Sequence, residues 1–342
     1  MPMSRSTTVT NPPPQPRPSR ARLATAFAAI YLVWGSTYLA IRYAIETIPP
    51  FLMAGTRFIV AGSALYLWSR LTGAERPSRA AWVAMAVTGI SMLGVGNGAV
   101  TWSEQRIPSG LAALLVASVA LWMVLLEFLR RNGTRPTKLS IVGLMLGFGG
   151  VALLVGPAAL TDARDLDVFA CVVLIGASLS WAAGSVYSRV LPRPQSAPLG
   201  SGMQMLAGGI ALLLVGASSG ELGRLDVGAV TTTSALSLGY LIVFGSLIGF
   251  TAYAWLLRVS TPAAVATYAY VNPVVAMLLG WLIAGEEFGV RMIAAAAVIL
   301  SGVALINRAS RQPARGTDAR ASAPALQNCP DIGHTGEFLA RR

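Results

Sequence analysis

Hydrophobic residues in this chain gather into runs of about twenty, separated by short stretches rich in arginine, proline and other polar residues. A run of this length can cross a lipid bilayer as an α-helix. The pattern therefore predicts ten membrane-spanning helices. The first five are Leu23–Tyr43, Phe51–Leu71, Trp82–Ser103, Ser109–Leu129 and Leu139–Val155. The second five are Val168–Val190, Leu199–Ala217, Leu236–Leu257, Pro262–Ala284 and Met292–Asn307.

The two sets of five helices share residues at nearly constant spacing. An offset of 147 positions pairs Trp34 with Trp181, Arg42 with Arg189, Gly55 with Gly202 and Gly62 with Gly209. An offset of 153 positions pairs Gly96 with Gly249, Ala99 with Ala252 and Trp102 with Trp255. Ordered similarity of this kind is the signature of an internal repeat. We expect one repeat over residues 23–155 and a second over residues 168–307.

Each predicted repeat holds an odd number of helices, which fixes how the repeats are oriented. After five crossings the chain is on the opposite side of the membrane, so the second repeat has inverted topology. Inverted repeats are typical of secondary transporters, whose halves exchange conformations around a site at the midplane. The predicted fold is an all-α membrane protein with ten transmembrane helices in two inverted five-helix repeats around a central cavity.

Composition agrees with a membrane protein, and charge indicates its orientation. Hydrophobic residues make up 54% of the chain and charged residues 12%, against about 25% charged residues in a soluble domain. The net charge is +12, but the basic residues lie in short loops and tails, so we expect no nucleic acid partner. Twenty of the Lys and Arg residues fall on one predicted side and five on the other. Because the cytoplasmic side carries the excess, both termini are predicted to be cytoplasmic, with residues 1–22 as a disordered basic arm and residues 308–342 as a disordered tail.

Several stretches resemble a known family. They include WGSTYLAIR from Trp34, SWAAGSVYSR from Ser180 and YAYVNPVVAMLLG from Tyr268. These motifs resemble the EamA-type transporters of the drug/metabolite transporter superfamily, most closely the YedA-like transporters of the bacterial inner membrane. The resemblance implies two inverted five-helix units, with a cavity between helices one to four and six to nine and with helices five and ten outside it. It also implies the export of amino acids, metabolites or drugs.

The chain departs from the family pattern at one point. Family members often carry a Glu-Pro pair in the fourth helix, where this chain has Val119-Ala120. The corresponding place in the ninth helix keeps Asn272-Pro273. We therefore expect a kink and a polar group on one side of the cavity only.

Arg57 is a cation about two turns inside the second predicted helix. Burying an unpaired arginine in the membrane costs about 3 kcal/mol or more, so Arg57 is expected to face protein or water. Three interpretations are open. Arg57 pairs with a carbonyl or polar neighbour, contacts an anionic substrate group such as a carboxylate, or extends to the membrane interface.

The ninth helix contains a second candidate site. Pro273 removes a backbone hydrogen bond and frees the carbonyl near Ala269. Free carbonyls at membrane depth are tolerated where they line a cavity. The alternative is a packed kink in which Asn272 donates a hydrogen bond to a neighbouring helix. Tyr268, Tyr270 and Asn272 are therefore candidates for the cavity wall.

Tryptophans and deep amides complete the candidate set. Trp34 and Trp181 are deep in their helices, whereas Trp102 lies near a helix end, where tryptophan also favours the membrane interface. Amides facing lipid would be costly, so Asn97 and Gln204 are expected to face other helices or the cavity. The predicted substrate-binding residues are Trp34, Arg57, Asn97, Trp102, Trp181, Gln204, Tyr268, Tyr270 and Asn272.

Some chemistry is missing from the predicted helices. No Asp or Glu lies in the middle of a helix, and Glu127 is near the cytoplasmic end of the fourth. Because a central carboxylate is the usual proton carrier, facilitated transport or exchange is favoured over proton coupling. We find no phosphate-binding loop, no histidine in the membrane and no cluster of metal ligands, so we expect no cofactor, metal or ATP-driven pump. Cys171 and Cys329 are not expected to form a disulfide.

The predicted function is a secondary transporter of the bacterial inner membrane that exports amino-acid-like or small amphipathic metabolites or drugs. Its expected partners are the lipid bilayer and a small-molecule substrate, with the protein as a monomer or weak dimer. A lipid flippase or scramblase is the main alternative, since inverted repeats also permit it. A membrane-embedded transferase is less favoured, because the acidic cluster of Asp162, Asp165 and Asp167 is interpreted as a solvated loop, and no catalytic residue is predicted.

Overall fold

The structure is a computed structural model that describes residues 18–103, 105–106, 112, 115–131, 133–155, 167–284 and 289–311. All regular structure in these ranges is helical. Seven of the described helices are long and apolar enough to cross a membrane, and two shorter apolar helices cover Leu115–Leu129 and Lys138–Leu154. Large hydrophobic side chains such as Leu67, Val83 and Leu214 are exposed, as a lipid environment allows.

The helices overlap the segments that hydrophobicity predicts. In the first half, the elements are α1 (Arg20–Ala44), α2 (Pro50–Leu71), α3 (Arg79–Gly89), η1 (Ile90–Asn97), α4 (Gly98–Ser103), α6 (Val119–Leu129) and α7 (Lys138–Val155). In the second half, they are α9 (Val168–Tyr187), α10 (Ala197–Ser218), α11 (Glu221–Arg224), η3 (Val227–Ala229), α12 (Thr232–Tyr240), η4 (Leu241–Phe250), α13 (Thr251–Val259), α14 (Pro262–Ala266), α15 (Tyr268–Ala284) and α16 (Val290–Arg311). The described part of the fourth predicted helix is incomplete, and Asp162, Asp165, Cys329 and most of both predicted tails lie outside the described residues.

Hydroxyl groups and prolines explain where several helices begin. The side-chain oxygens that accept a hydrogen bond from the backbone N–H three residues later belong to Ser19, Ser78, Ser196, Thr231 and Thr261. These bonds satisfy a donor that the first turn leaves free. Prolines occupy the first turn of α2, α10 and α14, where no helical hydrogen bond is lost.

Two of the long helices contain π-helical segments that the hydrophobic pattern did not predict. η1 continues α3, and η4 joins α12 to α13. Their positions are related by the sequence repeat, because shifting residues 90–97 by 153 positions gives residues 243–250, which lie within η4. π-Helical turns are rare and often mark functional sites. Both segments contribute to the cavity described below.

The ninth predicted helix is interrupted at a different place from the one its proline suggests. The break between α14 and α15 is at Thr267, six residues before Pro273, which lies inside α15. Thr267 Oγ1 donates a hydrogen bond to Ala264 O at 2.6 Å. This side-chain bond competes with the helical backbone pattern, so the hydroxyl rather than the proline marks the interruption.

α2 and α10 cross closely at glycines that the repeat relates. A Cβ atom on Gly62 would lie 3.0 Å from Gly202 O, and a Cβ atom on Gly209 would lie 3.1 Å from Gly55 O. Since Gly55 and Gly62 correspond to Gly202 and Gly209 in the repeat, the contact is reciprocal. Small residues allow two helix backbones in a membrane to approach in this way.

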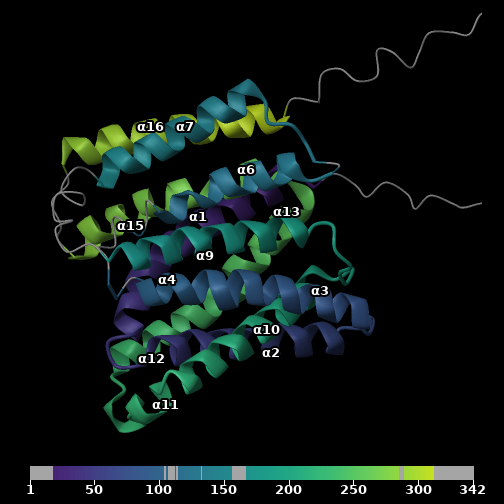
Figure 1. Cartoon of the computed structure of the whole chain (residues 1–342), viewed down its shortest axis with the longest axis vertical. Helices are drawn as coiled ribbons and strands as arrows, with labels where there is room; N and C mark the ends of the chain where they lie inside the picture. The colour runs from purple at the N-terminus through teal and green to yellow at the C-terminus, as the bar shows by residue number, and fades with distance from the viewer. Residues whose placement is uncertain are drawn as a thin grey trace, which may run out of the picture. The chain divides into compact units, whose positions relative to one another are not determined.

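α7 and α16 pack on each other beside the other helices. Figure 1 shows them together at the top of the view, while α2 and α10 lie near the bottom. A Cβ atom on Gly302 of α16 would lie 2.7 Å from Gly143 O of α7, so these two helices also meet at glycines. The arrangement agrees with the expectation that the fifth and tenth helices lie outside the cavity.

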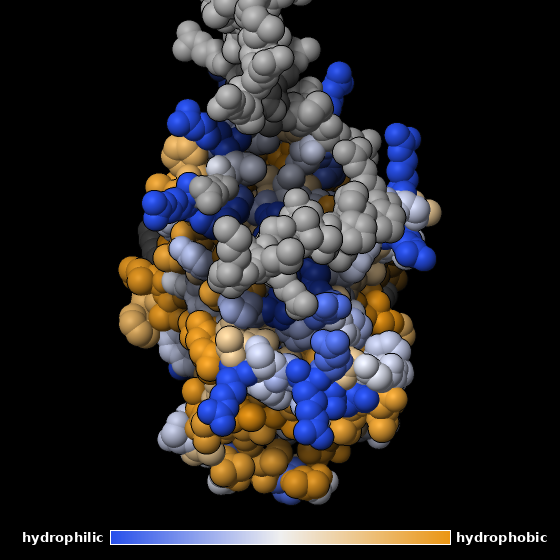
Figure 2. All heavy atoms as spheres, turned by 90° about the vertical axis from the view of Figure 1, so that its right-hand side faces the viewer, coloured by the Kyte–Doolittle hydropathy of each residue, from blue (hydrophilic) through white to orange (hydrophobic). Residues whose placement is uncertain are grey.

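Hydrophilic residues gather at the end of the bundle where α3 begins and α13 ends, on the right of Figure 1. Figure 2 shows this face, with hydrophilic side chains across its middle and hydrophobic ones along both flanks. The exposed Arg76 and Arg193 belong to connections at this end. A polar end and apolar flanks are what a membrane-spanning bundle requires.

Candidate binding cavity

A cavity lies between the helices, toward the end of the bundle where α1 turns into α2. The space between its atoms is about 760 Å³ when the solvent at its open side is included. Its wall combines α1, α2, η1, α4, α6, α9, η4 and α15, together with Val116 just before α6. The residues from α1 are Trp34, Thr37, Tyr38 and Ile41, all in the second half of that helix. The two halves of the chain therefore enclose the cavity together.

Arg57 of α2 brings a buried positive charge to the cavity wall. The residue is 5% exposed, and its Nε donates a hydrogen bond to Ser246 Oγ at 2.7 Å. A Cβ atom on Gly245 would lie 2.6 Å from Arg57 Nη2, so this glycine makes room for the guanidinium. Among the described residues, no carboxylate forms an ion pair with Arg57. A charge in this setting favours an anionic ligand.

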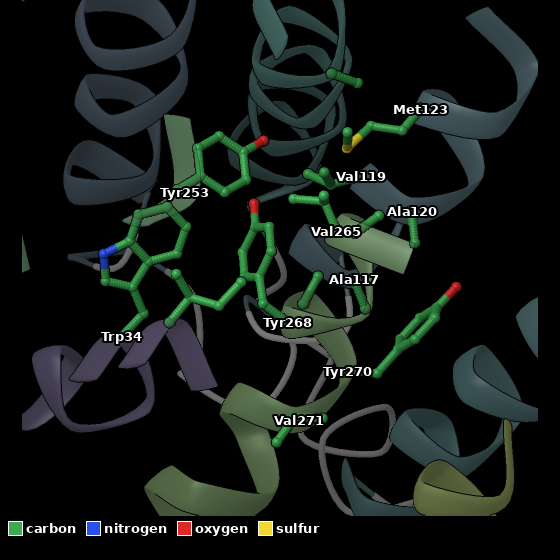
Figure 3. Packing of buried hydrophobic residues seen from close by; sticks show 14 of the residues in the cluster. Trp34, Ala117, Val119, Ala120, Met123, Tyr253, Val265, Tyr268, Tyr270 and Val271 are labelled. Carbon is green, nitrogen blue, oxygen red and sulfur yellow. The ribbon is translucent and has the colours of Figure 1, made fainter. Parts of the chain in front are cut away.

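Four aromatic rings pack together at one side of the cavity, and we call them the floor. Trp34, Trp181 and Tyr268 border the cavity, and the fully buried Tyr253 packs against all three. The centroid of the Trp34 ring lies 5.8, 5.0 and 4.9 Å from those of Trp181, Tyr253 and Tyr268. Figure 3 shows Trp34, Tyr253 and Tyr268 next to one another. Trp34 precedes the other α1 residues of the wall, so the floor lies on the side away from the turn between α1 and α2.

Hydrogen bonds orient the rings of the floor. Trp34 Nε1 donates to Gly245 O, and Trp181 Nε1 donates to Tyr253 OH, each at 3.0 Å. Ser185 Oγ lies 2.6 Å from the same Tyr253 hydroxyl. Buried indole and phenol groups need such partners, so this network sets the direction in which each ring faces.

The two tryptophans of the floor occupy related places in the two halves. A Cβ atom on Gly249 would lie 2.5 Å from Trp34 Nε1, and a Cβ atom on Gly96 would lie 3.2 Å from Trp181 Cε3. Each tryptophan therefore packs on a glycine of the other half, and the two glycines correspond in the sequence repeat.

Asn97 of η1 and Asn272 of α15 add amides to the wall. Asn272 is 3% exposed. With its amide nitrogen turned toward the backbone, it donates to Tyr268 O at 3.1 Å and to Tyr31 O at 3.3 Å. The second bond joins α15 to α1. The sequence left two interpretations of Asn272 open, a place in the cavity wall or a hydrogen bond to a neighbouring helix. In the structure Asn272 does both.

Six of the nine predicted binding residues border this cavity. They are Trp34, Arg57, Asn97, Trp181, Tyr268 and Asn272. Trp102 lies elsewhere, near a helix end, with the Arg106 guanidinium carbon 3.8 Å from its ring centroid. Gln204 also lies elsewhere, and its Nε2 donates to Thr88 Oγ1 at 2.9 Å.

Tyr270 is the third predicted residue that does not border the cavity. Its hydroxyl donates to Leu144 O of α7 at 3.4 Å. A Cβ atom on Gly147 would lie 2.6 Å from its ring, so the ring occupies the space that this glycine leaves. In Figure 3 Tyr270 lies apart from Tyr268, on the other side of α15. Tyr270 therefore joins α15 to α7 and does not border the cavity.

Several wall residues were missed by the sequence interpretation. Thr37 and Tyr38 follow Trp34 by one helical turn, and Phe58 follows Arg57 directly. Thr37 and Tyr38 could have been predicted from the sequence, since residues three and four positions after Trp34 lie on the same face of the helix. Phe250, the last residue of η4, carries no such signal, because the π-helical segment changes the spacing before it.

Acidic groups are absent from the described wall. Glu127 lies in the last turn of α6, is 5% exposed, and pairs with Arg130 Nη2 at 2.8 Å. Within the described residues, no group of three or more His, Cys, Asp or Glu side chains could hold a metal ion. The described side chains thus offer hydrogen bonding, one positive charge and aromatic contact.

Both the sequence and the fold of this chain are similar to those of known proteins. A model of the EamA-like transporter family matches residues 23–156 and again residues 168–308. The uncharacterized inner membrane transporter YedA of Escherichia coli K12 is 38% identical over 283 residues, which cover 82% of this chain and 89% of YedA. Protein PecM of Dickeya dadantii is 28% identical over 284 residues, which cover 81% of this chain and 91% of PecM. A solved crystal structure shares the fold with a TM-score of 0.69 at 20% identity, covering 86% of this chain and 100% of the other.

Proposed function

Because the chain belongs to the EamA-like transporter family, we propose that it is a secondary transporter that exports amino-acid-like or small amphipathic metabolites or drugs across the bacterial inner membrane. The observation that carries this proposal is the buried Arg57 in the wall of an aromatic cavity. A substrate carboxylate would supply the ion-pair partner, and forked guanidinium groups bind carboxylates well. The rings of Trp34 and Tyr268 would contact the apolar part of the substrate.

In this proposal, ten helices form two five-helix repeats of opposite topology, and the cavity between the repeats opens to one side of the membrane and then to the other. Two features support it: the reciprocal glycine contacts of α2 with α10, and the packing of each floor tryptophan on a glycine of the other half. The cavity lies toward the turn between α1 and α2, with the aromatic floor on its other side. Exchanging the conformations of the two halves would give access from the opposite side.

A substrate screen followed by a flux assay tests the proposed function. Purified protein is screened by thermal shift against amino acids and amphipathic carboxylates, and the compounds that stabilise it are tested for counterflow in proteoliposomes. We expect saturable exchange that substitution of Trp34 by alanine reduces. A lipid-flip assay runs on the same liposomes. Lipid movement without solute exchange would contradict the proposal and favour a flippase.

The lack of an acidic group in the described wall predicts that a pH gradient alone will not drive accumulation. With equal substrate on both sides of proteoliposome membranes, an imposed pH gradient should leave the distribution unchanged, since no carboxylate there can carry a proton. Accumulation that a protonophore abolishes would refute this prediction. Its loss in Glu127→Gln would then identify Glu127 as the proton carrier.

The distribution of basic residues predicts that both termini are cytoplasmic. Alkaline phosphatase fused after Arg342 should be inactive, because the enzyme matures only outside the cytoplasm. A truncated fusion after Ser219, in the connection that follows α10, should be active and serves as the matched control. The reverse pattern of activities would contradict the proposed topology.

A further inference from the structure

A second cavity lies between the end of α9, the start of α10 and the end of α13, at the end of the bundle predicted to face the cytoplasm. The space between its atoms is about 310 Å³. Three arginines border it: Arg189, Arg193 and Arg258. No Asp or Glu is among its described lining residues. The site therefore has a strong excess of positive charge.

Two polar atoms at this second cavity are buried without a hydrogen-bond partner among the described residues. They are Ser201 Oγ and Arg189 Nη1. Ser201 itself is 1% exposed. A buried donor that makes no hydrogen bond is costly, and native proteins contain few of them. A hydroxyl and a guanidinium that border one cavity call for a ligand with several acceptor oxygens.

The surrounding backbone holds the other two arginines in place. Arg258 Nη1 donates to Gln195 O at 2.8 Å, and Arg193 Nη1 donates to the backbone oxygens of Ser188 and Arg189. A Cβ atom on Gly200 would lie 3.2 Å from Arg258 Nη2, so glycine at this position leaves room for the guanidinium. The basic groups are thus fixed around the cavity by contacts within the protein.

Charges near the cavity do not neutralise it. Glu127 is the nearby acid, and its carboxylate is bound to Arg130 at 2.8 Å. Burial lowers the pKa of the Arg189 guanidinium; Glu127 opposes this effect, while Arg130 and Arg193 add to it. The first turn of the 22-residue helix α10 contributes further positive potential. The arginines and the first turn of α10 favour an anion, and Arg130 offsets the charge of Glu127.

We propose that this second cavity binds a phosphate group, carried either by an anionic lipid of the adjacent leaflet or by a soluble phosphate compound. Three guanidinium groups and a hydroxyl offer more donors than one carboxylate can accept, whereas a phosphate has several acceptor oxygens and up to two negative charges. The two cavities share no lining residue in this conformation, although Gln204, the counterpart of Arg57 in the repeat, borders the second one.

Thermal unfolding of the purified protein tests the shared chemistry. We expect inorganic phosphate to raise the unfolding temperature relative to chloride at equal ionic strength. Arg193→Gln is expected to weaken the apparent phosphate affinity by about tenfold, as loss of one charged contact of about 1.4 kcal/mol would. Arg193 is exposed, so this variant should fold. Ser201→Ala should also reduce the affinity, while Arg76→Gln, an exposed arginine away from the cavity, should not.

Native mass spectrometry separates the two sources of phosphate. Selective retention of phosphatidylglycerol over phosphatidylcholine, lost in Arg193→Gln, would identify a lipid headgroup. Stabilisation by inorganic phosphate without lipid selectivity would identify a soluble ligand. Equal unfolding temperatures in phosphate and chloride together with equal lipid retention would overturn the proposal, as would phosphate and lipid effects that Arg193→Gln and Ser201→Ala leave intact. None of these measurements requires a transport substrate, so the result is independent of the proposed transport function.

Discussion

Arg57→Gln is expected to raise the KM for a carboxylated substrate by about tenfold to a hundredfold while the protein remains folded. A hydrogen bond to a charged group contributes about 1.5–3 kcal/mol, and about 1.4 kcal/mol corresponds to a factor of ten in binding. Glutamine removes the positive charge but keeps an amide that can reach toward Ser246, the present partner of Arg57 Nε. The measurement is substrate-concentration dependence of exchange in proteoliposomes.

Two further variants separate substrate binding from a structural role of Arg57. Arg57→Lys should restore the KM only in part, because an ammonium cannot reproduce the planar fork of a guanidinium. Arg42→Gln is the matched control, since Arg42 lies in the last turn of α1 at the same end of the bundle but is exposed. If Arg57→Gln abolishes folded protein in the membrane, the pairing with Ser246 is structural and the binding role is wrong.

Arg57 and Trp34 can be identified from the sequence because each places a hydrogen-bonding side chain deep in an otherwise apolar helix. An unpaired polar group at that depth costs free energy. Polar groups in a membrane must be satisfied by protein or water, and the structure places both residues at the cavity. The repeat is equally readable, since matching residues at fixed offsets need no structure to be seen. The family resemblance drawn from these motifs is confirmed by the match to the EamA-like transporter family.

Helical geometry alone could have separated Tyr268 from Tyr270. Residues two apart on an α-helix point about 200° apart, whereas residues four apart nearly coincide. Tyr268 and Asn272 therefore share the cavity side of α15, and Tyr270 faces α7. Applying the helical spacing to Tyr268, Tyr270 and Asn272 together would have separated Tyr270 from the other two on the sequence alone.

The environment of Gln204 could not be read from the sequence. Gln204 occupies the place of Arg57 in the second repeat, yet it donates a hydrogen bond to Thr88 and lies away from the cavity that Arg57 borders. In one conformation the two halves of the chain have different surroundings, and a repeat in the sequence does not tell which of two corresponding residues borders the cavity. The π-helical segments η1 and η4 add a second difficulty, because they alter the helical spacing on which side-chain directions depend.

Gly202→Ala is expected to destabilise the protein by about 1–3 kcal/mol, the usual cost of adding atoms to a closely packed site. A Cβ atom on Gly202 would lie 2.8 Å from Tyr66 N and 3.0 Å from Gly62 O. Both contacts are to backbone, so no side chain can rotate away and α2 must separate from α10. Gly62→Ala should have a similar effect, and the double variant should be less destabilised than the sum, because both alanines spread the same crossing.

Gly176→Ala is the matched control for this crossing, because the same change in the same type of helix meets empty space. Gly176 lies in α9, is exposed, and has no atom within 4 Å of the position that a Cβ would take. Alanine favours an α-helix over glycine by up to about 1 kcal/mol, so Gly176→Ala should leave the unfolding temperature unchanged or raise it, while Gly202→Ala lowers it. Similar shifts in both variants would mean that helix propensity rather than the approach of α2 and α10 controls the outcome. The opposite signs, measured in one detergent on the purified protein, would establish that the glycines of the crossing are required for contact between the two halves of the chain.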